Sequence, residues 1–146
     1  MIRFINFWPP YFGSGIRVRR IDLAGGIVDV EMKLRWWNRN YVGTHYGGSL
    51  YSMCDPFFML ILLEHVGPRF TVWDKSASIR FRTPGRGLVR AHFEITPEEI
   101  AEIQETAMRG GKAEPRFVVK ILDQNDQVVA EVEKLVHVKY GKKVKR

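Results

Sequence analysis

The most apolar stretch of the chain runs from Leu50 to Leu63, directly after a polar, glycine-rich turn. Its apolar residues would surround a helix on nearly every side, and such a helix is usually buried rather than laid on a surface. The pattern therefore predicts a long central helix that the rest of the chain covers. Asp55 lies in the middle of this helix, where a charged carboxylate is costly unless another group pairs with it or uses it.

Alternation of apolar and polar residues predicts six strands around this helix. They cover residues 16–23, 27–36, 70–82, 88–95, 116–122 and 128–140. The first strand changes phase between Val18 and Ile21, which predicts a bulge. The second turns its even-numbered residues, as far as Trp36, toward the core. The third and fourth are joined by the turn Thr83–Gly87, which predicts that they pair as a hairpin.

Two shorter helices complete the predicted order of elements. Residues 1–13 are rich in aromatic residues, and Pro9–Pro10 limits them to a short helical hook packed on the body. Thr96–Glu99 has the residues of a capping box with proline at the first helical position. An antiparallel sheet with one apolar face needs a cover, which the central helix supplies. We therefore expect an α+β hotdog fold, a curved antiparallel sheet wrapped around a long central helix, as a single domain over residues 1–146 with a basic tail at 141–146.

Composition excludes several classes of protein. Hydrophobic residues make up 45% and charged residues 27%, as in ordinary globular proteins. The one cysteine, Cys54, rules out a disulfide framework and favours a reducing compartment, so we expect a cytoplasmic protein without a secretory signal. No apolar run approaches the roughly 20 residues of a membrane span. No spacing of His, Cys and Asp predicts a metal site.

The net charge of +7 comes partly from the tail and partly from arginines clustered around one turn. These are Arg80, Arg82, Arg86 and Arg90. They are most often a solvated strand face, but such a cluster also attracts a polyanion such as a phosphorylated cofactor or a nucleic acid.

One motif resembles a known family. Asn40-x-x-Gly43-Thr44-x-x-Gly47-Gly48, followed by Asp55 seven residues after Gly48, is similar to the active-site stretch of hotdog thioesterases of the phenylacetate-pathway type. The strongest resemblance is to the hotdog group DUF4442, which is related to the C-terminal domain of YiiD-like proteins. It covers about residues 15–140, and Asp74–Phe81 fits the strand that follows the helix in that group.

The resemblance implies an acyl-CoA thioesterase that needs no cofactor beyond the coenzyme A of its substrate. The backbone N–H groups of Gly47 and Gly48 would bind the thioester carbonyl. Asp55 would act as general base or nucleophile, its pKa raised by burial. Asn40, with Asn38 as the reserve, would orient substrate or water.

The resemblance also implies the assembly and the coenzyme A contacts. The family places its site between the subunits of a homodimer or of a dimer of dimers. The basic residues implied to bind the phosphates of coenzyme A are Lys75, Arg80, Arg82 and Arg86.

The position before the glycine pair departs from the family pattern. The family has histidine there, whereas this chain has Tyr46, with His45 one residue earlier. Either Tyr46 donates a hydrogen bond in its place, or His45 turns into the site. The departure favours a rival function, a non-catalytic hotdog module that binds acyl-CoA or a fatty acyl chain.

Three other interpretations rank lower. Asp55 followed by Pro56 is also a good start for a separate helix, with the aspartate as its N-cap. A hotdog dehydratase would pair His45 with Asp55 as base and acid. A nucleic-acid-binding protein would use the arginine cluster and the basic tail. We expect neither nucleic-acid binding nor a membrane span.

Overall fold

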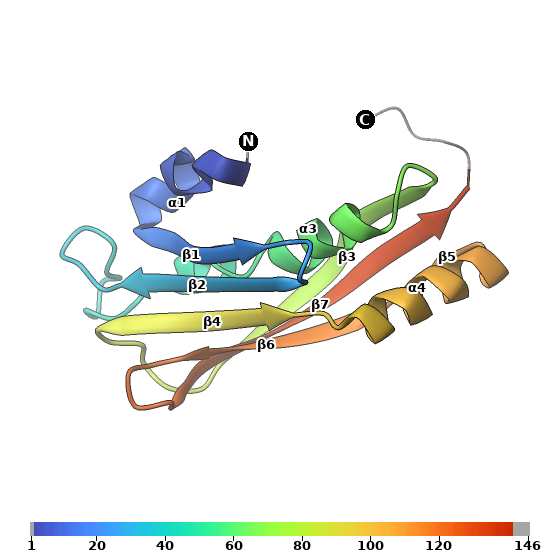
Figure 1. The fold of residues 1–146 in the computed structure, drawn as a ribbon. Coiled ribbons are helices and arrows are strands. Elements are labelled where there is room, and N and C mark those ends of the chain that lie inside the picture. The colour runs from blue at the N-terminus through green and yellow to red at the C-terminus, as the bar shows by residue number, and fades with distance from the viewer. Residues whose placement is uncertain (1, 142–146) are drawn as a thin grey trace.

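The computed structural model describes residues 2–141, so the predicted basic tail lies, from Lys142 on, outside the described residues. Seven strands form one antiparallel sheet that curves around a central helical segment (Figure 1). The strands are β1 (Ile16–Asp22), β2 (Ile27–Lys33), β3 (Phe70–Phe81), β4 (Leu88–Glu94), β5 (Lys112–Ala113), β6 (Arg116–Leu122) and β7 (Val128–Tyr140). The helices are the 3-10 helix η1 (Ile2–Phe7), α1 (Pro9–Ser14), α2 (Gly47–Ser52), α3 (Phe57–His65) and α4 (Pro97–Gly110). The predicted hotdog fold is confirmed.

The strands follow the order β1-β2-β4-β6-β7-β3, with the short β5 added to β7. The predicted pairing of residues 70–82 with 88–95 is therefore wrong. β3 pairs with β7 and forms one edge of the sheet, whereas β4 lies between β2 and β6. The Thr83–Gly87 segment runs from β3 at the edge of the sheet to β4 in its interior. It is held in place by the N–H of Leu34, which donates to the Gly87 carbonyl at 2.7 Å. Alternation fixes which residues face the core but not which strand is the neighbour.

Two details of the first strands differ in outcome. The predicted bulge is confirmed, because the register of β1 against β2 shifts between Val18 and Arg20. The predicted extent of the second strand is wrong. β2 ends at Lys33, and Trp36 is exposed in the loop that follows instead of facing the core.

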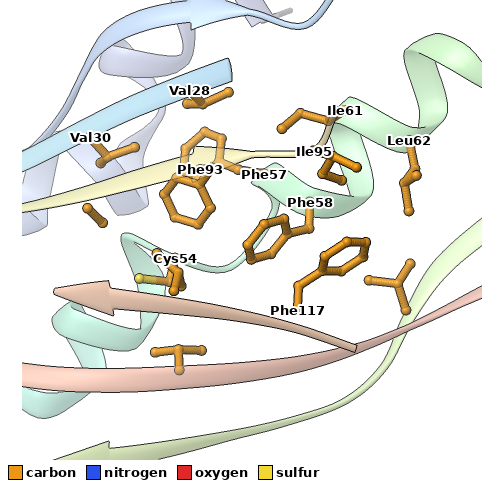
Figure 2. Close-up of a cluster of buried hydrophobic side chains, with 14 of the residues drawn as sticks. Val28, Val30, Cys54, Phe57, Phe58, Ile61, Leu62, Phe93, Ile95 and Phe117 are labelled. Atoms are coloured by element: carbon orange, nitrogen blue, oxygen red, sulfur yellow. The ribbon is translucent and has the colours of Figure 1, made fainter. Parts of the chain in front are cut away.

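The core is built on α3, which packs against β4 and β6 (Figure 2). The ring of Phe58 stacks on Phe117 with centroids 4.6 Å apart, and Phe57 and Phe58 both contact Phe93, at 5.0 and 5.2 Å. Cys54 is buried beside them, and burial raises the pKa of its thiol, as expected for a packing residue rather than a nucleophile. These contacts hold the start of α3 firmly against the sheet.

The predicted long central helix is present, but it is broken into two pieces beside Pro56. α2 ends at Ser52, α3 begins at Phe57, and a turn joins them. Pro56 has no N–H to donate, and the Ser52 carbonyl instead accepts a hydrogen bond from the Tyr11 hydroxyl at 3.3 Å. Asp55 does not cap the second piece, because Pro56 occupies the N-cap position of α3 and no side chain bonds there.

The smaller helices follow the sequence signals only in part. α4 begins with the predicted capping box, in which Thr96 and Glu99 exchange two hydrogen bonds, and ends at Gly110, followed by Gly111 as the C-cap with φ of 79°. The hook forms as η1 and α1, beside β1 in Figure 1. Tyr11 is buried there, but most of its aromatic residues are exposed, so the expectation that they pack on the body is wrong.

Candidate functional site

The break between α2 and α3 brings Asp55 to a lysine on the sheet. Lys134 of β7 is completely buried, and its Nζ donates to Asp55 Oδ1 at 3.0 Å, to Tyr51 Oη at 3.2 Å and to Asp74 at 2.8 Å. Tyr51, one turn before Asp55, donates its hydroxyl to the same Oδ1 at 2.8 Å. We call Tyr51, Asp55, Asp74 and Lys134 the Asp55 cluster. It joins the helix break to β3 and β7.

The charges of the Asp55 cluster are set by their mutual contacts. Burial by itself lowers the pKa of Lys134, but the carboxylates of Asp74 and Asp55 outweigh it and raise that pKa, so the ammonium is charged at neutral pH. Burial and the nearby Asp55 raise the pKa of Tyr51, which keeps its proton. A charged lysine with two carboxylates in contact is a paired buried charge.

Asp55 itself is not buried as expected, since its side chain is 50% exposed. The break turns it away from the apolar core and toward Lys134. Both of its hydrogen bonds use Oδ1, and no donor among residues 2–141 contacts Oδ2. A carboxylate with one oxygen held and the other open is arranged to take a proton or to attack a carbonyl.

The sequence prediction missed Lys134. It lies two residues from Val132 and two from Val136, so it belongs to the apolar register of β7. A lysine in the core-facing phase of a strand is rarely buried unless it is paired. That single break in the alternation was the available signal, and it predicts an acidic partner on the covering helix.

Most of the other predicted residues surround a second feature, an open cavity of about 520 Å³ between the start of α2 and the end of β3. We call it the glycine cavity. Its lining includes Asn40, His45, Gly47, Phe81, Arg82 and Arg86. Gly47 is the first residue of α2, and no acceptor in the described part of the chain contacts the N–H of Gly47 or Gly48. Two amide donors at a helix start favour a partial negative charge on an oxygen.

Asn40 and His45 build the wall of this cavity. The Asn40 side chain bonds the Thr44 hydroxyl at 2.9 Å and accepts from the N–H groups of Val42 and Thr44, so it shapes the turn. His45 is 3% exposed, and its Nε2 donates to the Gly87 carbonyl at 3.0 Å. Burial lowers its pKa, so the ring is neutral with an unprotonated Nδ1 that has no partner among the described residues.

Tyr46 stands at the sequence position of the family histidine, but its side chain does not line the glycine cavity. It is the N-cap of α2, it is exposed, and its ring lies over Gly48. A Cβ at Gly48 would come within 2.5 Å of the Tyr46 ring, and one at Gly47 within 2.9 Å of Phe81. Both rings are exposed, so each could turn aside for a larger residue at these positions. His45 faces the Gly85–Gly87 backbone and is not brought together with Asp55.

The remaining predicted residues lie apart from both features. Asn38 is a structural clip, because its side chain bonds the backbone of Ser14, Lys33 and Arg35. Lys75 pairs with Glu114 at 2.8 Å. Arg80 is exposed on β3 and does not line the glycine cavity, unlike Arg82 and Arg86.

The fold is the hotdog fold, and comparison with known proteins finds hotdog structures described as thioesterases. A Pseudomonas aeruginosa structure described as a probable thioesterase is 27% identical, covering 89% of this chain and 86% of its own, with a TM-score of 0.80. A Staphylococcus aureus thioesterase mutant is 16% identical, with coverages of 85% and 93% and a TM-score of 0.62. A Haemophilus influenzae thioesterase is 11% identical, with coverages of 88% and 81% and a TM-score of 0.61.

The family model for DUF4442, a domain of unknown function, matches residues 1–138. This chain therefore belongs to the DUF4442 family. No curated protein matches the sequence. In the described residues, no helix is long and apolar enough to cross a membrane.

Proposed function

We propose that the protein is an acyl-CoA thioesterase in which Asp55 activates the attacking water. The observation that carries the proposal is the geometry of this carboxylate, which is held at Oδ1 by Lys134 and Tyr51 and is open at Oδ2. Its place on the broken central helix matches the family carboxylate, and the solved structures similar to this one include thioesterases.

Hydrolysis would proceed as follows. The thioester carbonyl oxygen accepts hydrogen bonds from the N–H groups of Gly47 and Gly48, which stabilise the negative charge of the tetrahedral intermediate. Water adds to the carbonyl carbon and gives a proton to Asp55 Oδ2. The carbon–sulfur bond then breaks, and the proton passes to the leaving thiolate, so the products are the carboxylic acid and free coenzyme A. Lys134 keeps its charge throughout and holds Asp55 in place.

The proposed site needs two copies of the chain. Within one chain Asp55 does not line the glycine cavity, because α2 and the following turn separate it from Gly47. β3 is a sheet edge of 12 residues whose second half is largely exposed, and such an edge is a template for pairing with another copy. Pairing of two β3 edges would bring Asp55 of one subunit toward the glycine cavity of the other. A dimeric mass in solution tests this arrangement.

The test of function is thiol release from short, long and aryl acyl-CoA esters. We expect turnover by the wild type and a loss of 100-fold or more, on the order expected for a general base, in Asp55→Asn. Asp29→Asn is the matched control, because Asp29 lies on the exposed face of β2 beside His92. Equal rates for the wild type and Asp55→Asn would remove Asp55 from the mechanism.

A second candidate function is supported by the position before the glycine pair. Tyr46 is exposed and His45 is bound to Gly87, so no histidine side chain occupies the family position. A hotdog module that binds acyl-CoA without hydrolysing it would need only the glycine cavity and its arginines. Binding of acyl-CoA esters with no turnover of any of them would favour this function over catalysis.

A further inference from the structure

The N-terminal end of the molecule exposes aromatic residues from two separate segments. Their exposed fractions lie between 48% and 78%. They are Phe4, Phe7, Trp8, Phe12, Trp36 and Trp37. We call this set the aromatic face, and it includes three of the protein's four tryptophans. Single exposed apolar side chains are ordinary, but a gathered set of this size marks an interaction surface.

The two segments form one surface. Phe7, Phe12 and Trp37 line the same open cavity, of about 810 Å³, along α1 and the first two strands. Asn38 joins the segments, because its Nδ2 donates to the Ser14 carbonyl at the end of α1 at 2.9 Å. In Figure 1, the end of α1 lies at the same side of the molecule as the loop that follows β2.

The fold holds these rings outward. Asn6, between the exposed Phe4 and Phe7, exchanges two hydrogen bonds with the backbone of Val18, at 2.7 and 3.2 Å. Tyr11, beside the exposed Phe12, is buried and bonds the Ser52 carbonyl. The segment therefore has its own buried anchors, and the exposure of its other aromatic residues is not a failure to pack.

The surface beside these rings is positively charged. The cavity that Phe7, Phe12 and Trp37 line is also lined by Arg17, Lys33 and Arg35, and none of the three forms an ion pair within residues 2–141, although Glu31 lies across from Arg17. Arg19 is there as well, but it is paired with Glu31 at 3.4 Å. The guanidinium of Arg35 lies 5.2 Å from the centre of the Trp37 ring. Aromatic and cationic side chains therefore lie side by side around this cavity.

We propose that the aromatic face docks on a bilayer of anionic phospholipids, with its rings at the level of the headgroups and Arg17, Lys33 and Arg35 on the phosphates. Aromatic rings favour the membrane interface, and each cation near an anionic bilayer strengthens binding. A second copy of the chain fits this surface less well, since a symmetric contact would bring its cations against their own counterparts. The proposal does not depend on the thioesterase function.

The experiment uses the full chain with vesicles of phosphatidylcholine alone and vesicles that also contain phosphatidylglycerol. We expect co-sedimentation with the anionic vesicles, weaker binding at high salt, and a blue shift of tryptophan fluorescence. The combined change Phe7→Ser, Phe12→Ser and Trp37→Ser should weaken binding about tenfold or more, because binding scales with inserted apolar area. The matched control, Met108→Ser with Val118→Ser, removes exposed apolar side chains elsewhere and should leave binding unchanged.

A second pair of variants tests the charges without touching the rings. Arg17→Gln with Lys33→Gln should weaken binding about 25-fold, at about fivefold per cation. Lys120→Gln with Lys139→Gln removes the same charge from exposed positions on β6 and β7 and should have a much smaller effect. A chain that lacks residues 142–146 should still bind, because the proposal assigns binding to the aromatic face.

Any one of the following results would overturn the proposal. The first is a wild type that binds neither kind of vesicle. The second is unchanged binding by the aromatic variant, or complete loss of binding on removal of the tail. The third is a fall in molecular mass of the aromatic variant, by light scattering, while the wild type ignores vesicles, which would assign the surface to contact between copies.

Discussion

Lys134 and His45 are both almost fully buried, at 0% and 3% exposed, yet the structure treats their nitrogen atoms differently. The Lys134 ammonium is charged and meets two carboxylates and a hydroxyl. The His45 ring is neutral, and one of its two nitrogens has no partner in the described chain. Around Lys134 the protein stabilises a charged ammonium. Around His45 it favours the neutral imidazole.

The difference matches the part that each region plays in the proposed reaction. The Asp55 cluster has to hold a carboxylate in one orientation, which the hydrogen bonds from Lys134 and Tyr51 do. The glycine cavity has to bind a thioester and the phosphates of coenzyme A. The amide donors at the start of α2 and the neutral His45 suit the thioester, and the charges of Arg82 and Arg86 suit the phosphates. The predictions below test this division, one region at a time.

The largest expected effect follows from removing the cation of the Asp55 cluster. Lys134→Met leaves Asp55 and Asp74 without their shared partner, and breaking a buried pair costs about 3–5 kcal/mol. Because Asp55 is half exposed and Asp74 partly so, water compensates in part, and we expect about 2–3 kcal/mol less free energy of unfolding. Urea denaturation measures this loss.

The controls for that change lie in the same cluster and the same strand. Adding Asp74→Asn to Lys134→Met removes one of the two stranded charges and should restore part of the stability. Lys139→Met changes an exposed lysine of β7 and should stay within about 0.5 kcal/mol of the wild type. A Lys134→Met protein as stable as that control would mean that the cluster stabilises nothing.

An intermediate effect is expected at the glycine cavity and rests on the proposed function. Arg82→Gln and Arg86→Gln should each raise KM for acyl-CoA about tenfold, since a hydrogen bond to a charged group contributes about 1.5 kcal/mol. KM for the matching acyl-pantetheine ester, which has no nucleotide phosphates, should not change. The control is Arg116→Gln, because Arg116 pairs with Glu133 on the exposed face of the sheet. Equal effects on both esters would contradict a phosphate-binding role.

Much of the fold followed from local signals in the sequence. The capping box of α4 and the bulge of β1 each depend on a few neighbouring residues, and both are confirmed. The pairing of β3 with β7 depends on contacts about 60 residues apart in sequence, which alternation does not encode. Non-local pairing is therefore where the prediction failed.

The candidate site divides in the same way. The motif around Gly47 gathers at one cavity because its residues are close in sequence. Lys134 lies 79 residues from Asp55, so no spacing rule joins them. Only the mismatch between a lysine and the apolar register of β7 indicated that a carboxylate had to be near. The prediction that Asp55 is buried was wrong for a related reason, since it assumed an unbroken helix where Pro56 turns the chain.

The smallest expected effect distinguishes the two buried nitrogens by pH. Burial lowers the pKa of His45 in the folded protein, so as pH falls below the ordinary value of about 6.5 the unfolded state takes up the proton first and the free energy of unfolding decreases. One proton limits this slope to about 1.4 kcal/mol per pH unit. His45→Gln, which keeps a donor for the Gly87 carbonyl, should flatten the slope between pH 7 and pH 5 in urea denaturation. Lys134 contributes nothing in this window, because its raised pKa lets its stabilisation fall only above its ordinary value near 10.5. An unchanged slope in His45→Gln would show that the ring is not kept neutral by the fold, and the contrast between the two regions would then fail.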